Sequence, residues 1–301
     1  MLSIGVHYNK GNWKTCLMEN GHTLELRLFK DVCAALEYVQ FHCAIFPEPV
    51  ITLSINSGTY LTPVHTYAEG QLSEKTLNSD HIQREDDLNT FRIAVGSSSH
   101  NTFHLPPLNQ LPDVPIFRRQ HRLDMGGSDT LCATALLLYR LRRQEAIWQE
   151  MRFLYVDAGY DARSIVVVED GRIVNGIGET SATYCSQATS LERNEPANWS
   201  DHLEQEALVK QAFWEGLTQD LAGLMAIHHL EDIVVTGQLK EAVIEKLEDR
   251  YQFYLFPYNE HEQVGFEAAI GAAIIAEGLY RPGLAAEVVE RLQITYGRQS
   301  E

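Results

Sequence analysis

The sequence predicts an α/β protein with two similar halves, and a repeated pattern of residues is the main reason. The stretch VHYNKGNWKTCLMENG begins at Val6, and VDAGYDARSIVVVEDG begins at Val156. Each contains an apolar strand, a polar turn with glycine, a second apolar strand and a Glu-Asn-Gly or Glu-Asp-Gly end, a pattern typical of a β-hairpin. In both halves strand and helix patterns follow this opening, as in α/β proteins. At about 150 residues per domain, a chain of 301 residues has room for two.

The first half is predicted to begin with a three-stranded meander. Asn20 and Gly21 favour a hairpin turn that needs positive φ. The polar residues 64–90 indicate a surface excursion with a short helix near 73–77, and 96–128 indicate a long ordered loop. The predicted strands cover 2–6, 14–19, 23–28, 50–55 and 91–95, and the predicted helices cover 31–43 and a segment that starts near Asp129.

The second half repeats this opening and then alternates helices with strands. The predicted strands cover 152–157, 163–169, 172–176, 232–237 and 251–257, and the predicted helices cover 201–229, 239–250, 265–280 and 285–294. We therefore expect a domain over 1–145, with a loop-rich insertion over 56–128, and a second domain over 146–301.

Composition excludes several classes of protein. The net charge of −17 argues against non-specific binding to nucleic acid and against binding to anionic membranes, although a small anionic substrate stays compatible if dipoles or a bound cation offset the field. No apolar run reaches roughly 18 residues, and the start of the sequence has no signal-peptide pattern, so we expect a cytoplasmic protein. The cysteines are odd in number and form no CxxC pair, which predicts reduced thiols and no zinc site; they are Cys16, Cys33, Cys43, Cys132 and Cys185.

The turns of the two hairpins are candidate phosphate-binding sites. A tight turn with small residues exposes backbone N–H groups that can hold phosphate oxygens, and two such turns across a cleft would hold a polyphosphate from both sides. The first turn offers Lys10, Gly11 and Asn12, and the second offers Asp157 and Gly159. An Asp at the end of a strand can hold Mg²⁺ through water, which makes Asp157 the candidate metal ligand. For the hairpins, the alternative is that both are ordinary and similar by chance. For Lys10, the alternative is an exposed loop lysine with no ligand.

Glycines elsewhere in the second half suggest close approach of the backbone to a ligand. The buried strand of DIVVTGQLKEAVIEKL ends at Gly237, immediately before a helix. In NGIGETS, Gly176 and Gly178 would let the backbone pass near a cleft, and Thr180 and Ser181 could donate hydroxyl hydrogen bonds. For Gly237 the alternative is an ordinary strand–turn–helix connection.

The order of these features resembles the superfamily of actin, sugar kinases, acetate kinase and the heat-shock chaperone ATPases. That resemblance implies two pseudo-symmetric ribonuclease H-like (actin-like ATPase) subdomains with a cleft between them. It also implies that the two hairpins bind phosphates and that the segment at Gly237 contacts adenosine. Five segments are further similar to a prokaryotic family known as predicted butyrate kinase: HLPPLNQLPDVPIFRRQHRLDMGGSDTLCATALLLY, INSGTYLTPVHTY, NGIGETSA, TGQL and GFEAAIGAAIIAEGLY.

Two positions depart from the pattern of these families. His7 stands where kinases of the superfamily carry Asp, and a neutral imidazole cannot replace a carboxylate in holding hydrated Mg²⁺. Thr130 stands where the narrower family tends to have a basic residue after the central Asp.

That central residue, Asp129, is the candidate catalytic residue. By resemblance to a pantothenate-kinase branch it would act as general base or substrate anchor, whereas its place at a helix start also suits an N-cap; the two roles are compatible. One of Arg118, Arg119 and Arg122 could bind a carboxylate or phosphate, with structural pairing as the alternative. The adjacent His228 and His229 lack the spacing of a metal site, so we expect them to be structural.

The resemblance implies an ATP- and Mg²⁺-dependent phosphotransferase that acts on a small carboxylate or hydroxyl acceptor, and a homodimer is compatible with it. The alternative, which His7 favours, is a protein that binds a nucleotide as a sensor and transfers nothing. A third reading is an interaction protein with a vestigial cleft.

Overall fold

The computed structural model describes residues 1–9, 11–55, 61–64, 79–159, 163–184, 199–259, 262 and 264–294. The chain forms two compact units, and each is discontinuous in sequence. The first unit consists of Met1–Pro107, Ser128–Glu145 and His261–Glu301, and the second of Leu108–Gly127 and Ala146–Glu260. This division differs from the two continuous domains expected over 1–145 and 146–301, because helices from the end of the chain pack in the first unit.

The sheet of the first unit begins with the predicted meander. Its strands are β1 (Leu2–Asn9), β2 (Asn12–Glu19), β3 (His22–Phe29), β4 (Val50–Ser54), β5 (Thr62–Pro63) and β6 (Thr102–His104). They lie in the order β3-β2-β1-β4-β6-β5. The β1–β2 and β2–β3 pairs are antiparallel, whereas β4 is parallel to β1 and to β6. The positive φ angles of Asn20 and Gly21 confirm the predicted hairpin turn.

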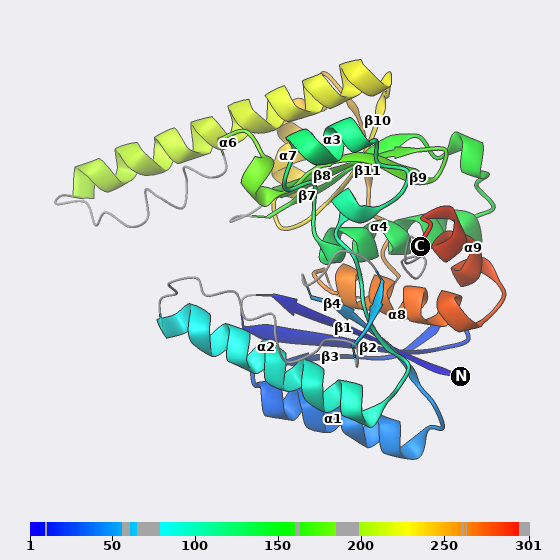
Figure 1. Cartoon of the computed structure of the whole chain (residues 1–301). Helices are drawn as coiled ribbons and strands as arrows, with labels where there is room; N and C mark the ends of the chain where they lie inside the picture. Colours follow the sequence, from blue (N-terminus) through cyan, green and yellow to red (C-terminus); the bar gives the residue numbers. More distant parts are fainter. Residues whose placement is uncertain are drawn as a thin grey trace. The chain divides into compact units, whose positions relative to one another are not determined.

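Helices cover both faces of this sheet, as Figure 1 shows for α1 and α2 on one side and α8 on the other. The helices of the unit are α1 (Val32–Ile45), α2 (Ser79–Ser98), α4 (Ser128–Arg143), α8 (Glu267–Tyr280) and α9 (Leu284–Arg291). Along β1 the residues alternate between the faces. Ile4 and Val6 join the α1–α2 core, whereas Gly5 lies against the backbone of α8.

Two predictions for the first half were wrong. Residues 91–95 were expected as a strand, but they belong to α2, where Phe91 and Val95 lie one helical turn apart and are both buried in the core. The expected long loop over 96–128 contains the strand β6 and the helix α3 (Ile116–His121). The short helix predicted near 73–77 lies outside the described residues.

The second unit repeats the arrangement of the first. Its strands are β7 (Phe153–Ala158), β8 (Arg163–Glu169), β9 (Arg172–Ile177), β10 (Asp232–Thr236) and β11 (Gln252–Leu255), in the order β11-β10-β7-β8-β9. Again three antiparallel strands come first, and two parallel strands extend the sheet. Even the irregularities agree, because a register shift lies between Leu17 and Met18 in β2 and between Val167 and Val168 in β8. The repeat is therefore structural, as the sequence predicted.

The helices α6 (Trp199–His228) and α7 (Lys240–Leu247) pack on one face of the second sheet (Figure 1). Leu154 and Val156 of β7 point into that core, which leaves Asp157 for the opposite face. Asp157 thus occupies the place in β7 that His7 occupies in β1.

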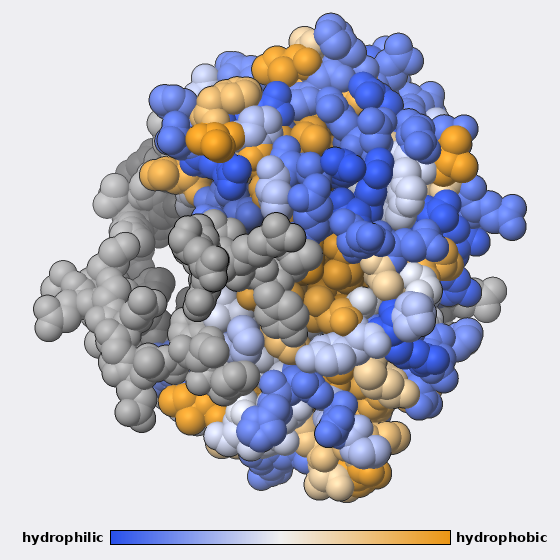
Figure 2. Space-filling model, turned by 45° about the vertical axis from the view of Figure 1, so that its right-hand side comes forward, coloured by the Kyte–Doolittle hydropathy of each residue, from blue (hydrophilic) through white to orange (hydrophobic). Residues whose placement is uncertain are grey.

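Hydrophilic residues dominate the face of the molecule in Figure 2, and hydrophobic residues lie between them in separate groups. Within the part of the chain that the structure describes, no helix is both long and apolar enough to cross a bilayer.

Candidate functional site

The first hairpin turn joins β1 to β2 and contains two of the described candidate residues. Gly11 has a φ of +80°, a conformation that favours glycine, and Asn12 begins β2. Lys10 lies outside the described residues. The turn is therefore present where the sequence predicted it, whereas the role of Lys10 stays a prediction.

His7 is nearly buried at the end of β1, with only 6% of its surface exposed. Its Nδ1 lies 3.3 Å from both the carbonyl oxygen and the hydroxyl of Ser54 in the neighbouring strand β4. A carbonyl can only accept a hydrogen bond, so this contact favours the tautomer with the proton on Nδ1. Burial lowers the pKa of His7 below its ordinary value, although the carboxylates of Asp129 and Glu267 oppose this shift. The side chain is therefore a neutral imidazole.

Lys14 and Glu267 also influence His7, and neither was predicted from the sequence. Lys14 lies opposite His7 in β2, and its Nζ donates a hydrogen bond to the carbonyl of Gly265 at 2.6 Å. The same Nζ lies 5.6 Å from the ring centre of Phe266. Glu267 is buried in the first turn of α8. The sequence shows an acid directly after Gly-Phe, but only the packing of α8 against β1 buries it and brings it near His7.

Asp129 lies in the first turn of α4, which begins one residue earlier at Ser128. A carboxylate in the first turn is stabilised by the positive end of the helix dipole. The carboxylate is partly buried, and its negative charge opposes the lowering of the pKa of His7. The first unit therefore brings Asp129, His7, Lys14 and Glu267 together.

In the second unit, Asp157 and Gly237 lie at the carboxyl ends of neighbouring parallel strands. Asp157 is exposed near the end of β7, and Thr236 of β10 is its register partner. Gly237 has a φ of +93°, and a Cβ there would lie 2.7 Å from Oδ1 of Asp157 and still closer to the carbonyl of Ala158. Glycine is therefore required for this close approach. Gly159 follows β7 directly, and residues 160–162 of the turn lie outside the described residues.

A polar group next to Gly237 was not anticipated from the sequence. The hydroxyl groups of Thr236 and Tyr258 lie 2.5 Å apart. The ammonium of Lys240 lies 5.6 Å from the ring centre of Tyr258. This places a cation and an aromatic ring beside the carboxyl end of β10.

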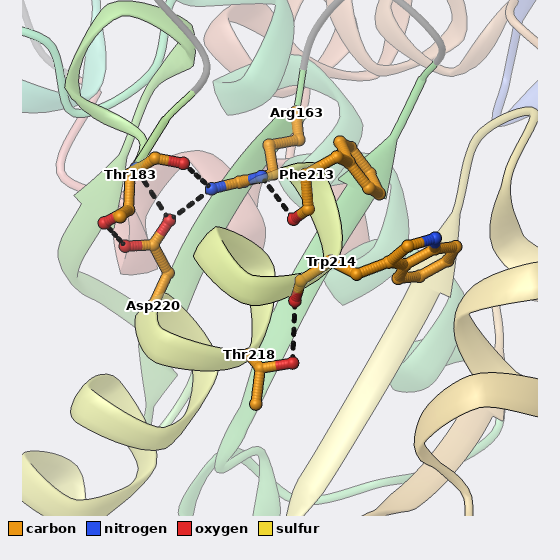
Figure 3. Close-up of polar contacts among 6 residues, drawn as sticks. All are labelled: Arg163, Thr183, Phe213, Trp214, Thr218 and Asp220. Carbon is orange, nitrogen blue, oxygen red and sulfur yellow. Dashed lines mark hydrogen bonds and ion pairs between the residues drawn. The ribbon is translucent and has the colours of Figure 1, made fainter. Parts of the chain in front are cut away.

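Arg163 anchors the second hairpin to α6, as Figure 3 shows. Its guanidinium is fully buried and donates to the carbonyls of Phe213 at 3.0 Å and Thr183 at 2.5 Å, and to Asp220 at 2.8 Å. Asp220 also accepts hydrogen bonds from the N–H and hydroxyl of Thr183. A Cβ on Gly216 would collide with this network. This buried ion pair gives the hairpin a defined position, since breaking it would leave an uncompensated charge.

The glycines of NGIGETS approach protein rather than open space. A Cβ on Gly176 would overlap the carbonyl of Met125, and one on Gly178 would overlap the carboxylate of Asp124. The N–H and hydroxyl of Thr180 both donate to Asp124 at 2.8 Å.

Two of the three candidate arginines make structural hydrogen bonds to the strand β9. Arg118 donates to the carbonyl of Val174, and Arg122 donates to the carbonyl of Gly176. These contacts support the structural alternative for both arginines.

His228 is structural, as expected. Its Nδ1 lies 2.8 Å from Glu169, and its Nε2 lies 3.0 Å from the amide nitrogen of Asn175. Burial lowers the pKa of His228, so a neutral ring joins α6 to β8 and β9. Among the residues that the structure describes, no three His, Cys, Asp or Glu side chains lie close enough to hold a metal ion together.

The architecture defines the class of protein to which the chain belongs. In both units three antiparallel strands are extended by two parallel ones, and the short strand β5 is added at the edge of the first sheet. The two units are the ribonuclease H-like subdomains of the actin-like ATPase fold. Acetate kinase from Entamoeba histolytica shares this fold, with a TM-score of 0.51 and 8% identity over 93% of this chain and 100% of that one.

Two further kinase structures are also similar. The ROK hexokinase from Thermus thermophilus has a TM-score of 0.48 and 11% identity, over 91% of this chain and 97% of that one. The inorganic polyphosphate/ATP-glucomannokinase from Arthrobacter sp. strain KM has a TM-score of 0.46 and 13% identity, over 93% and 99% of the two chains. At these identities the likeness concerns the fold alone.

Residues 42–194, just over half of the chain, match the family described as "Protein of unknown function (DUF1464)". The chain belongs to this family. A search of curated proteins found no match.

Proposed function

We propose that the chain binds a nucleoside triphosphate, with its phosphates at the β7–β8 hairpin. The observation that carries this proposal is the adjacency of Asp157 and Gly237 at the carboxyl ends of β7 and β10. In open α/β sheets, ligands bind at these strand ends where the strand order changes direction. Here the antiparallel meander begins on one side of β7 and the parallel strands on the other.

The nucleotide of the proposal is ATP with Mg²⁺. The exposed carboxylate of Asp157 suits a hydrated cation, and no further carboxylate is needed when water and phosphate oxygens fill the other positions. The metal, when bound, would neutralise charge on the phosphates. Backbone N–H groups near Gly159 would hold phosphate oxygens, and Gly237 would face the adenosine. The turn at Gly11 and Asn12 is the candidate phosphate-binding turn of the first unit.

We further propose phosphoryl transfer to a small carboxylate or hydroxyl acceptor, with Asp129 as the acceptor-positioning residue or general base. The name predicted butyrate kinase, given to the family that the sequence resembles, fits a short-chain carboxylate as one such acceptor. Asp129 supports the proposal because it lies in the first turn of α4, beside His7 at the strand end.

A nucleotide sensor without transfer is the second candidate, and His7 favours it. The imidazole is neutral and nearly buried, so it cannot replace the carboxylate that kinases of this fold use at the first hairpin. In this case the protein would be stabilised by Mg-ATP and would release no ADP.

Thermal unfolding with and without Mg-ATP tests the nucleotide site. We expect Mg-ATP to raise the Tm of the wild type and to leave that of Asp157→Ala unchanged. Asp249→Asn removes a different exposed carboxylate of the same unit and serves as the control. An Asp157→Ala protein that responds like the wild type would contradict the placement of the site. ADP release with acetate, butyrate, glycerol or glucose then separates the phosphotransferase from the sensor.

A further inference from the structure

The segment 108–127 lies within the longest of the five family-like segments of the sequence, and the proposed function does not use it. The chain leaves the first unit after Pro107, runs through this segment in the second unit and returns to the first unit at Ser128. We call 108–127 the docking arm. The N–H of Leu108 donates to the carbonyl of Gly126 at 3.0 Å, which closes the arm at its base.

The arm is held on the end of β9 by side chains of its own. Arg118 donates to the carbonyl of Val174 at 2.9 Å, and Arg122 donates to the carbonyl of Gly176 at the same distance. The side-chain amide of Asn175 accepts a further hydrogen bond from Arg122 at 3.3 Å. Hydrogen bonds to charged donors are stronger than neutral ones, so these contacts fix the arm along the strand.

Asp124 is the centre of this junction. One carboxylate oxygen accepts from the N–H and the hydroxyl of Thr180 at 2.8 Å, and the other accepts from the N–H of Gly126 at 3.1 Å. The backbone carbonyl of Asp124 accepts from the N–H of Gly178 at 3.1 Å. Since a Cβ on Gly178 would overlap the carboxylate, only glycine permits this approach. The segments LDMGG and NGIGETS are therefore the two halves of one junction.

The junction lies close in sequence to the candidate catalytic residue. Asp124 precedes Asp129 by five residues, and extended chain covers at most about 3.3–3.6 Å per residue. The intervening Gly126 has a φ of +118°, and α4 begins at Ser128. The position of Asp124 therefore limits where the first turn of α4 can lie.

We propose that Asp124 is a positioning residue: with Thr180 it holds the docking arm on β9, and the ordered arm restrains the start of α4, and with it Asp129, in the free protein and when a nucleotide is bound. This inference rests on the proposed function. In this inference the hydroxyl of Thr180 donates a hydrogen bond to Asp124. The hydroxyl of Thr180 is therefore a structural donor rather than a phosphate ligand.

Hydrogen exchange of the intact protein tests the inference, with Thr180→Val and Thr180→Ser as a matched pair. Valine keeps the shape and removes the hydroxyl, whereas serine restores it. Without nucleotide, we expect Thr180→Val to speed exchange at least tenfold in peptides covering 108–127 and 128–136, and Thr180→Ser to behave like the wild type. Peptides of β8 should be unchanged, which separates a local effect from a general loss of stability.

Calorimetric titration with a non-hydrolysable ATP analogue and Mg²⁺ provides the second readout. The Kd should change by less than threefold in Thr180→Val, while protection of 128–136 by the analogue, seen in the wild type, is lost. Faster exchange confined to 108–127, or protection of 128–136 that survives in Thr180→Val, would overturn the inference. If the wild type does not bind the analogue, the proposed function fails, and exchange in the free protein still decides whether the arm positions α4.

Discussion

At the scale of single residues, the burial and charge of the His7 side chain depend on the face of the sheet toward which it points. Strand alternation places His7 on the face that α8 covers, where Lys14, Asp129 and Glu267 influence the imidazole. The equivalent residue of the second unit, Asp157, is exposed. The same strand position therefore carries a neutral, buried side chain in one unit and an exposed acid in the other.

Restoring an acid in the first hairpin should make stability depend on a divalent cation. In His7→Asp a carboxylate would be buried beside Asp129 and Glu267, and Lys14 offsets only part of that negative charge. We expect a loss of about 3–5 kcal/mol in the free energy of unfolding, the range for an uncompensated buried charge. Addition of Mg²⁺ should recover part of this loss.

Urea unfolding with and without Mg²⁺ measures both effects, and His7→Asn is the neutral control. The interpretation fails if His7→Asp and His7→Asn are equally stable in the absence of the cation.

At the scale of secondary structure, α8 packs closely because its contact residues are small. A Cβ on Gly5 would overlap the backbone of Ala269, and a Cβ on Gly271 would overlap the carbonyl of Cys132 in α4. The helix thus touches β1 on one side and α4 on the other at backbone distance. Close packing of this kind leaves no room for an added methyl group.

Gly271→Ala should destabilise the protein although alanine is the better helix former. We expect a loss of about 1–3 kcal/mol from overpacking against Cys132. Gly223→Ala, in α6, is the matched control because a Cβ there meets no atom within 4 Å. It should instead stabilise by about 0.5–1 kcal/mol. Urea unfolding of the two variants measures the contrast, and equal changes of one sign would contradict it.

At the scale of the whole molecule, the first unit depends on residues from the end of the chain. Helix α8 packs on β1, β2 and β4 of that unit and on α4. Its buried Ile270, Ile274 and Ile275 contribute to the interior. Burial of each such side chain is worth about 1.5–3 kcal/mol, so their loss is comparable with the total stability of a domain.

The continuous fragment 1–145 should therefore not fold alone. We expect it to show no cooperative unfolding transition by circular dichroism in urea. The same fragment joined to 262–294 by a flexible Gly/Ser linker should regain one. Cooperative unfolding of 1–145 without the added segment would contradict this prediction.

Local patterns in the sequence were sufficient for much of the fold. The repeated hairpins and the elements of the second half were predicted because their signals, strand alternation and the φ requirement of Asn-Gly and Asp-Gly turns, lie within a few residues. Prediction failed at Phe91 and Val95, where a short apolar run fits a strand or one face of a helix equally well.

The sequence by itself determined the repeated pattern of strands and the turns at Gly21 and Gly171, since each depends on neighbouring residues alone. It also showed that His7 stands in the first half where Asp157 stands in the second. Only the tertiary structure decided that α8 belongs to the first unit and that Gly176 and Gly178 receive the docking arm. The physical reason is that these contacts join segments far apart along the chain. A glycine in the sequence shows that another segment can approach closely, but it does not show which segment does so.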